Sequence, residues 1–405
     1  MHPAEEIRGS KSTLLLNKRI VLGVTGSIAA VETIKLSREL ICHGADVIPV
    51  MSPAAARIIH PDALWFATGH QPICELTGET EHVQFCGKVK QPVDLYLISP
   101  CTANTISKIA YGIDDTAITT FATTAIGSKI PVVIVPSMHQ SMYDHGMVQQ
   151  NIASLKLNGV VFIGPSIEAN KAKMASIERI AHQVIRLLGP RDFNSKKVLI
   201  IGGSTAEPID AVRSLCNTSS GKTAIALSQS AYHHGAMVEL WYGQSSQPIP
   251  SYIEDVTVFT SISDVEALVR SKDFSEIDII FVCAALSDYI PTRTNGKIPS
   301  DGHQLSILCH PAPKILSLLH EKARHTAIIG FKLEQEKDIL LSKAKKLQET
   351  YDLEMVIANT VDNLRTEYGE VVLIRYDGTI RQVKGSKTEI AEEVFSFFIE
   401  KMRHD

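Results

Sequence analysis

The sequence of 405 residues has no apolar stretch approaching the roughly 20 residues that a membrane-spanning helix needs. Its first residues include Glu5 and Glu6, where a signal peptide would carry only positive charge. We therefore expect a cytoplasmic protein with no membrane partner.

Positive charge is not in excess either. The chain has 40 Lys and Arg residues against 44 Asp and Glu residues, which gives a net charge of −4 at pH 7. The sequence thus lacks the broad basic field that would bind nucleic acid. A ligand that carries phosphate would have to be bound by a few local groups.

Cysteine, proline and glycine are too sparse to define a special class of protein. The seven cysteines are scattered and never spaced as C-x-x-C, so neither a zinc site nor a disulfide framework is indicated. With 18 Pro, 24 Gly and 44% apolar residues, the chain is neither fibrous nor disordered. At about 150 residues per domain, its length predicts two or three domains.

Short β-branched runs do alternate with helix-length segments along the whole chain. This alternation indicates βαβ units, and hence an α/β fold with two doubly wound, Rossmann-like domains and mostly parallel sheets. An amphipathic helix near 177–188 followed by a Gly-Pro turn places the domain boundary between domains 1–190 and 191–405. Each of the runs 19–26 and 197–204 is expected to be a first strand that enters a small-residue loop, and further strands are expected at 46–51, 95–99, 132–136, 237–241, 279–283, 327–331 and 355–358. Helices of the second domain are expected at 221–234, 311–322, 334–348 and 387–402, with a hairpin turn at Asp377-Gly378.

The loop after the first strand does not have the form of a dinucleotide site. Gly23-Val-Thr-Gly26 lacks the third glycine, and the next strand ends at Met51-Ser52-Pro53 without a carboxylate for ribose. A nicotinamide oxidoreductase is therefore disfavoured. Thr25, Gly26 and Ser27 could still bind one phosphate at a helix start, with Ser52 adding a hydroxyl, as a mononucleotide such as FMN requires. Plain helix capping by Thr25 and Ser27 stays open.

A second loop imitates the end of a phosphate-binding Walker A motif. In Ser219-Ser-Gly-Lys-Thr223 the first glycine of that motif would fall at Cys216, and the nearest strand ends too early for the strand-loop-helix unit. A P-loop is therefore rejected. The segment can nevertheless open a helix at Gly221 and present backbone N–H groups to phosphate beside Lys222.

Eight motifs, in order and spacing, resemble those of a known enzyme family. Four in the first half resemble the flavin-dependent phosphopantothenoylcysteine decarboxylases, and four in the second half resemble phosphopantothenate-cysteine ligase. Together they resemble the bifunctional enzymes of coenzyme A biosynthesis, in an archaeal-like variant. The motifs are GVTGSIAA (23–30), EHV (81–83), SPCTAN (99–104), PSMHQSMY (136–143), EPIDAVR (207–213), NTSSGK (217–222), AALSDY (284–289) and KI (297–298).

The resemblance implies two reactions, each in one domain. Domain 191–405 would join 4'-phosphopantothenate to cysteine through an acyl-nucleotide, using CTP or ATP and Mg²⁺. Domain 1–190 would bind FMN and decarboxylate 4'-phosphopantothenoylcysteine to 4'-phosphopantetheine. The family further implies a homo-oligomer, with trimers of the first domain and dimers of the second building a dodecamer. No metal ligands can be identified. A flavin-binding regulatory or scaffold relative that lacks one or both activities is the alternative.

In the first domain the resemblance makes His82 catalytic, because an imidazole can act near neutral pH on the substrate thiol or carboxylate. The alternative is that His82 is a surface or hydrogen-bonded histidine with no catalytic role. Met138 and His139 would bind substrate, with His139 standing where most relatives have Asn. Relatives carry a clamp cysteine that residues 164–174 lack, so the proton donor is not identified. Asn170, Lys171 and Lys173 of that segment could hold a phosphate or form a solvated turn. The implied cofactor-binding residues are Gly26, Ser27, Ser52, Thr102, Ala103 and Asn104, of which Thr102 and Asn104 would otherwise be a helix cap.

In the second domain the resemblance makes Asn217 and Lys297 catalytic, with Lys297 on a loop over the nucleotide. Arg213 and Lys222 would bind the anionic substrate, although each cation alone could be a solvated surface charge. Asp288 is expected to be an unpaired carboxylate at a strand end. The implied nucleotide-binding residues are Gly203, Ser204, Ala285, Asp288, Lys297 and Phe331, with Asn359 a weaker candidate; core packing is an equal account of Ala285 and Phe331.

Overall fold

The computed structural model describes residues 2–168, 171–300, 304–363 and 366–402. The chain divides into two compact units, residues 1–189 and 190–405. Helix α9 (Ile177–Leu188) precedes the division. The Ser176 side chain accepts a hydrogen bond from the Arg179 backbone at its start, and Gly189 caps its end.

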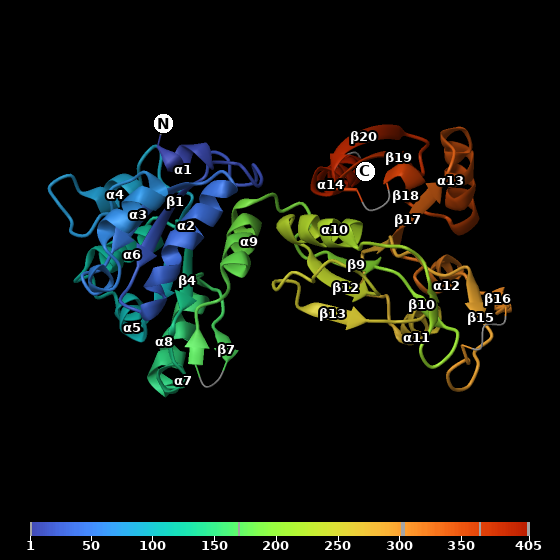
Figure 1. Cartoon of the computed structure of the whole chain (residues 1–405). Coiled ribbons are helices and arrows are strands. Elements are labelled where there is room, and N and C mark those ends of the chain that lie inside the picture. Colours follow the sequence, from blue (N-terminus) through green and yellow to red (C-terminus); the bar gives the residue numbers. More distant parts are fainter. Residues whose placement is uncertain (1, 169–170, 301–303, 364–365, 403–405) are drawn as a thin grey trace. The chain divides into compact units, whose positions relative to one another are not determined.

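A parallel five-stranded sheet forms the centre of the first unit, in the order β2-β1-β3-β4-β6 (Figure 1). Side chains of β1 alternate between two buried clusters, with Leu22 in one and Val21 in the other. Four of the five strands are buried on both faces and are apolar runs, which is the pattern that predicted them. The bounds of the five strands are β1 (Arg19–Val24), β2 (Asp46–Met51), β3 (Leu95–Cys101), β4 (Val132–Pro136) and β6 (Val161–Phe162), of which β6 was not predicted.

Helices cover both faces of this sheet, as a doubly wound fold requires. The face that carries Leu22 packs against α1 (Pro3–Glu6), α2 (Thr33–Cys42), α3 (Pro61–Thr68) and α9. The face that carries Val21 packs against α4 (Glu81–Cys86), α5 (Ala103–Tyr111), α6 (Ala117–Gly127) and α8 (Gly146–Leu157). Short 3-10 turns, η1 (Ile28–Glu32) and η2 (Ala55–Arg57), follow β1 and β2.

The second unit contains an eight-stranded sheet in the order β13-β12-β9-β14-β17-β18-β19-β20. Neighbouring strands are parallel from β13 to β18, and β19 and β20 form an antiparallel hairpin. Gly378, at φ +84, allows the tight turn expected between them. The bounds are β9 (Lys197–Gly202), β12 (Met237–Tyr242), β13 (Asp255–Val258), β14 (Ile279–Val282), β17 (Ala327–Glu334), β18 (Met355–Thr360), β19 (Tyr368–Arg375) and β20 (Ile380–Ser386).

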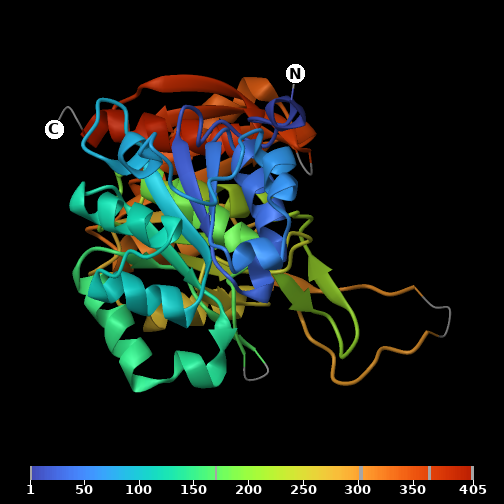
Figure 2. The ribbon, with the colours of Figure 1, turned by 90° about the vertical axis from the view of Figure 1, so that its left-hand side faces the viewer.

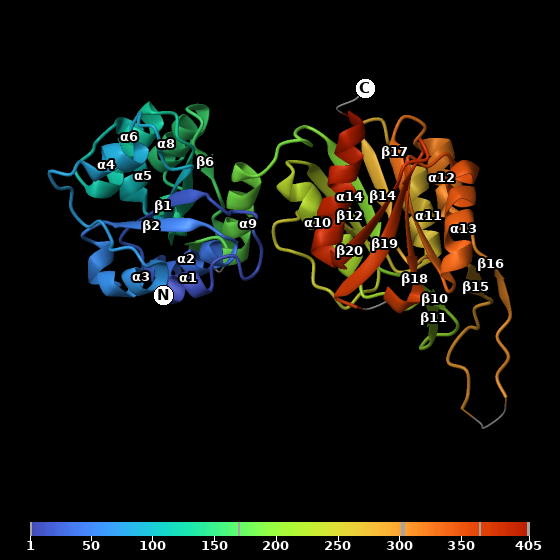
Figure 3. The same ribbon diagram turned by 90° about the horizontal axis from the view of Figure 1, so that it is seen from above.

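Two groups of helices cover the eight-stranded sheet (Figure 3). One face packs against α10 (Lys222–His233) and α14 (Lys387–Met402), and the other against α11 (Ile262–Ser271), α12 (Ile315–Lys322) and α13 (Lys337–Tyr351). The doubly wound α/β fold with mostly parallel sheets is therefore confirmed. The helix expected at 311–322 begins only at Ile315, because residues 309–311 are taken up by a strand.

That strand belongs to one of two short ladders at the carboxyl edge of the second sheet. β10 (Ala206–Pro208) pairs with β11 (Ser214–Cys216), and β15 (Tyr289–Pro291) pairs with β16 (Cys309–Pro311). Figures 2 and 3 show the chain beyond β15, in orange, extending away from the sheet of this unit. Among the helices that the structure describes, none combines the length and apolar character needed to cross a lipid bilayer.

Candidate active sites

Loops at the carboxyl ends of β1, β3 and β4 are hydrogen-bonded to one another in the first unit. The Thr25 hydroxyl donates to the Pro100 carbonyl oxygen at 2.8 Å and accepts from the Thr102 backbone N–H at 3.1 Å. The hydroxyls of Ser27 and Ser137 lie 3.0 Å apart. The structure therefore brings Ser27 and Thr102 to one edge of the sheet, where doubly wound folds bind ligands.

Gly26 and Ser52 lie at the same edge. A Cβ on Gly26 would come within 2.5 Å of the Ala54 Cβ, so the loop after β1 approaches the start of η2 as only glycine allows. The Ser52 backbone N–H donates to the Val24 carbonyl oxygen at 3.0 Å, and its hydroxyl accepts from the Ala55 N–H at 3.2 Å. Hydroxyl and amide groups gathered in this way suit the phosphate of a flavin mononucleotide.

Thr102, Ala103 and Asn104 open α5. The Thr102 hydroxyl accepts from the Thr105 backbone N–H at 3.4 Å, as a helix cap does. Ala103 is buried, whereas the Asn104 side chain is exposed. The capping interpretation thus holds for Thr102, and contact of the three residues with a flavin stays a prediction.

His82 lies on α4, a helix that packs against α6 through the stacked rings of Phe85 and Phe121, 6.4 Å apart. Its Nδ1 atom is buried and has no hydrogen-bond partner among the described residues. No hydrogen bond in that part of the chain joins His82 to the loops that hold Ser27 and Thr102. The catalytic role of His82 therefore stays a prediction.

The segment without the clamp cysteine lies beside the predicted substrate residues. Strand β8 (Lys171–Lys173) pairs with β7 (Ser166–Glu168) on one side and with β5 (Met138–His139) on the other. His139 is exposed and caps α7 (Gln140–Tyr143), with Nδ1 2.9 Å from the Ser141 hydroxyl. Lys173 is exposed, and Asn170 lies outside the described residues.

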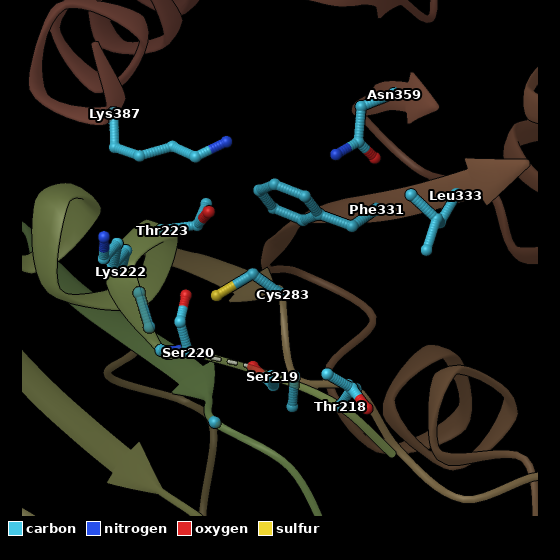
Figure 4. Close-up of a pocket in the computed structure, with 15 residues that line it drawn as sticks. Thr218, Ser219, Ser220, Lys222, Thr223, Cys283, Phe331, Leu333, Asn359 and Lys387 are labelled. Carbon is cyan, nitrogen blue, oxygen red and sulfur yellow. Dashed lines mark hydrogen bonds between the residues drawn. The ribbon is translucent and has the colours of Figure 1, made fainter. Parts of the chain in front are cut away.

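A cavity of about 190 Å³ lies at the carboxyl edge of the second sheet, between α10 and α14 (Figure 4). Its walls come from the ends of β9, β14, β17 and β18 and from the starts of the two helices. Among its lining residues are four that the sequence predicted and one weaker candidate: Gly203, Lys222, Ala285, Phe331 and Asn359.

The start of α10 forms one wall of this cavity. Gly221 adopts φ +75 as the N-cap, and its backbone N–H donates to the Ser219 hydroxyl at 3.3 Å. Lys222, Thr223 and Ala224 follow and also line the cavity. Because the first N–H groups of a helix have no intrahelical acceptor, this wall favours an anion.

Two lysines reach the cavity. Lys222 forms an ion pair with Glu367 and retains only 20% exposure of its side chain. Lys387, at the start of α14, was missed by sequence reasoning; a lysine that opens a helix gives no local signal of a binding role. Burial lowers the pKa of Lys387, the charge of Lys222 lowers it further, and Glu367 opposes both effects.

Asn217 and Ser204 are engaged with the backbone near the cavity. The Asn217 amide donates to the Leu286 carbonyl oxygen at 2.9 Å and to that of Ala285 at 3.4 Å. Ser204 is buried, and its hydroxyl donates to the Gln244 carbonyl oxygen at 3.1 Å. Asn217 thus ties the loop before α10 to the loop after β14.

Arg213 contacts the segment around Lys297, which we call the strap (residues 294–300). Its guanidinium donates to Asp210 at 2.6 Å, to the Ile298 carbonyl oxygen at 3.2 Å and to the Ser300 hydroxyl at 3.3 Å. The Ile298 N–H donates to Asp210 at 3.0 Å, and this and other backbone N–H bonds hold the pKa of Asp210 well below its usual range. Lys297 itself is exposed.

Asp288 corrects one expectation. Its carboxylate is not unpaired, because Lys314 Nζ lies 2.6 Å away, and both side chains are largely exposed. Asp288 is not among the residues that line the cavity. Within the described ranges, no cluster of three or more His, Cys, Asp or Glu residues could hold a metal ion.

Both halves of the chain match families of known proteins. Residues 8–189 match the Flavoprotein family, and residues 193–402 match the family described as DNA/pantothenate metabolism flavoprotein C-terminal domain. The chain is 42% identical over 407 residues to the coenzyme A biosynthesis bifunctional protein CoaBC of Thermococcus kodakarensis, across 99% of this chain and 100% of that protein. The chain belongs to the CoaBC family.

The CoaBC protein of Methanocaldococcus jannaschii is 38% identical over 402 residues, across 97% of this chain and 96% of that protein. A solved C-terminal domain of a CoaBC protein is 26% identical, with a TM-score of 0.44, and covers 53% of this chain and 100% of that domain. The resemblance drawn from the eight motifs is confirmed.

Membership of the CoaBC family establishes the activity. The chain is a bifunctional enzyme of coenzyme A biosynthesis, with phosphopantothenoylcysteine decarboxylase and phosphopantothenate-cysteine ligase activities. It carries a flavoprotein domain, to which FMN is suited, and its substrates derive from pantothenate. The regulatory or scaffold alternative is thereby set aside.

Proposed function

We propose that the second unit catalyses the ligation with CTP or ATP, and that the first unit then decarboxylates the product. The observation that carries this assignment is the cavity between α10 and α14, where two lysines and a helix N-terminus favour an anionic substrate. In the ligation, a carboxylate oxygen of 4'-phosphopantothenate attacks the nucleotide α-phosphate and pyrophosphate leaves. The cysteine amine then attacks the acyl carbon, and the nucleoside monophosphate leaves.

In this reaction both reactants are anions, so the site has to offset their charges. Asn217 would donate to the activated acyl group without adding charge, and Lys297 would act on the nucleotide phosphates from the strap. Lys222 and Arg213 would bind the substrate. Mg²⁺ would be held chiefly by the triphosphate oxygens, since this ion usually keeps several waters and phosphate ligands.

The nucleotide would lie at the carboxyl edge of the second sheet. Gly203, at φ +80, brings its backbone close to Gly243 and lines the cavity together with Ala285 and Phe331. Ser204 supports this loop through its bond to the Gln244 carbonyl oxygen. Asp288 lies on the loop that leads into β15. To bind a ribose, its carboxylate would have to release Lys314, with which it forms an ion pair.

In the first unit Gly26, Ser27 and Ser52 would hold the FMN phosphate, and Thr102, Ala103 and Asn104 would border its ring. FMN, when bound, would supply redox chemistry in both directions, since two electrons leave the cysteinyl thiol before carbon dioxide is lost and return afterwards to give the thiol of 4'-phosphopantetheine. His82 would be the residue that transfers a proton to or from the substrate. His139 would donate to the substrate carboxylate beside β8, and Met138 would contact the substrate there.

We further propose a cytoplasmic homo-oligomer, in which trimers of the first unit and dimers of the second unit form a dodecamer. Light scattering of the purified chain measures the mass of the assembly directly and so tests this prediction. Closed symmetric assemblies are the usual form of homo-oligomers, and this one would place both activities in a single particle.

The assignment of the two reactions is tested by one substitution in each unit. His82→Gln should abolish release of carbon dioxide and leave ligation intact, whereas Lys297→Gln should do the reverse. Products are measured by mass spectrometry with cysteine and either CTP or ATP, and an absorbance spectrum reports bound flavin. If each variant retained both activities, the assignment of sites would be wrong.

A further inference from the structure

The segment that follows β4 brings a histidine to the carboxyl edge of the first sheet. The Ser137 hydroxyl lies 3.0 Å from that of Ser27, and the Ser137 N–H donates to the Cys101 carbonyl oxygen at 3.0 Å. The next side chain, Met138, packs against the core of the unit. His139 then caps the start of α7 with its side chain exposed. An imidazole is thereby placed beside the loops that would hold FMN.

The ring of His139 is held through its Nδ1 atom. Nδ1 lies 2.9 Å from the Ser141 hydroxyl, and the Ser141 N–H donates to it at 3.4 Å. Because a hydroxyl both donates and accepts, Ser141 can pair with Nδ1 in the neutral ring and with Nδ1–H in the imidazolium. No hydrogen bond within the described ranges involves Nε2 of His139, so its N–H group is left for the substrate.

Decarboxylation needs an acid at the carbon that carries the carboxylate. Oxidation of the cysteinyl thiol gives a thioaldehyde, and loss of carbon dioxide from it leaves an enethiolate. This enethiolate has to accept a proton at the carbon that lost the carboxylate before a hydride can return to the carbon that bears sulfur. A group already hydrogen-bonded to the carboxylate lies next to that carbon when carbon dioxide leaves.

We propose that His139 is a catalytic residue that donates this proton. The Nε2–H bond of its imidazolium breaks, a C–H bond forms at the carbon that has lost carbon dioxide, and the ring is left neutral. The resulting thioaldehyde takes back, as hydride from the reduced flavin, the electron pair that the thiol gave up. His82 keeps its proposed role before carbon dioxide leaves. The inference rests on the proposed contact of His139 with the substrate carboxylate.

The buried thiols of the first unit are poor acids for this step. Cys101, at the end of β3, is fully buried in the core, and burial raises the pKa of its thiol. Cys86 lies in the same core, where burial raises the pKa of its thiol to about 12. Residues 164–174 contain no cysteine. An exposed lysine of β8, Lys173, is the rival that the experiment has to exclude.

The products of the full chain separate binding of the carboxylate from donation of the proton. His139→Asn keeps a hydrogen-bond donor but has no acid, so first-turnover release of carbon dioxide should stay within about tenfold of the unaltered rate. Formation of the thiol should fall by about 10²- to 10⁴-fold, the usual effect of losing a general acid. Mass spectrometry should find the enethiol instead of 4'-phosphopantetheine, and without oxygen the absorbance of the bound flavin should stay low.

His145→Asn is the matched control. His145 is also exposed and caps a helix, α8, by accepting from the Met147 N–H through its Nδ1 atom. This variant should form the thiol at the unaltered rate. Added imidazole gives a readout that a merely structural role would not move, since it should restore thiol formation to His139→Ala and leave the unaltered chain unaffected.

Four results would overturn the role given to His139. These are thiol formation at the unaltered rate by His139→Asn, no recovery of His139→Ala with imidazole, equal losses of carbon dioxide release and thiol formation in His139→Asn, and accumulation of the enethiol by Lys173→Gln alone. The third result would limit His139 to substrate binding, and the fourth would assign the proton to Lys173. If the unaltered chain released no carbon dioxide from phosphopantothenoylcysteine, the proposed decarboxylation itself would fail.

Discussion

At the scale of single residues, Asp210 is the buried end of a series of contacts that reaches Lys297. The Asp210 carboxylate accepts from the Ile298 N–H, and Arg213 bridges the same carboxylate and the Ile298 carbonyl oxygen. Both backbone groups of the residue next to Lys297 are thereby fixed. The resemblance assigned Arg213 to substrate binding, but in this structure its guanidinium is hydrogen-bonded to Asp210 and to the strap.

We expect Asp210→Asn to lower the kcat of ligation by about 10- to 100-fold and to leave decarboxylation unchanged. An amide in place of the carboxylate accepts fewer of the N–H groups, so the strap loosens and Lys297 is less well positioned. Ligase kinetics with both substrates measure the effect, with Ser300→Ala, which removes one exposed contact, as the mild control. Arg213→Gln should lower kcat in the same way and, because Arg213 is also proposed to bind substrate, should raise the KM for 4'-phosphopantothenate as well. A raised KM with an unchanged kcat would show that Arg213 does not position the strap.

The residues of the cavity between α10 and α14 show what sequence motifs can and cannot predict. Gly203, Lys222 and Phe331 each belong to a strand-end or helix-start pattern, and all three line the cavity. Lys387 has no such pattern around it and reaches the cavity only because α14 packs beside α10. The pairing of Asp288 with Lys314 likewise depends on tertiary structure that local spacing does not encode.

At the scale of elements, α9 packs against α2 through a pair of histidine rings. His43 and His182 lie 5.6 Å apart in an edge-on arrangement, and the Ser12 hydroxyl lies 2.7 Å from His43 Nδ1. Glu39, 3.3 Å from His43 Nε2, and Lys11, which pairs with Glu39, are charged groups near the pair. Burial, with the charge of His43 adding to it, lowers the pKa of His182 to about 4, and burial also lowers that of His43.

This histidine pair predicts a loss of stability in mild acid. Well above pH 6.5 the His182 ring is neutral in both the folded and the unfolded chain, so protonation of His182 does not reduce the free energy of unfolding there. Between about pH 6.5 and 4 only the unfolded chain takes up the proton, which costs the folded first unit roughly 2–3 kcal/mol. Scanning calorimetry across this range should show that the melting temperature of the first unit depends less steeply on pH in His182→Gln than in the unaltered chain. His60→Asn, at an exposed helix cap, should keep the steep profile, and equal slopes in all three proteins would contradict the prediction.

Regular elements were predictable where burial imposes a period on the sequence. Most strands of both central sheets were expected because both of their faces are buried. The edge strands β6 and β13, which are only partly buried, were not expected. The small sheet of β5, β8 and β7 was not, since its strands are two or three residues long and carry no period. The start of α12 was placed too early for a related reason, because β16 is fixed by its pairing with β15.

At the scale of the whole molecule, each unit buries a core of its own. The clusters of the first unit end at Ile185, and those of the second unit begin at Phe193. Phe193 is fully buried and packs edge-on against Phe395 at 5.2 Å, and its N–H donates to the His234 carbonyl oxygen. The length of the chain allowed two or three domains, the helix and Gly-Pro turn before residue 191 predicted two, and the structure divides the chain into two units after residue 189.

Separate cores predict that the chain can be divided without loss of either activity. Fragments 1–189 and 190–405 should each fold, the first binding flavin and decarboxylating phosphopantothenoylcysteine, the second forming it. A cut after Ser195 is the matched control: it leaves fragment 196–405 without Phe193, and loss of a buried phenylalanine costs about 3–5 kcal/mol. That fragment should melt well below fragment 190–405 in a thermal unfolding assay and lose ligase activity first on warming. Equal melting temperatures would show that Phe193 is dispensable to the second core, and failure of fragment 190–405 to fold would show that the two cores are not independent.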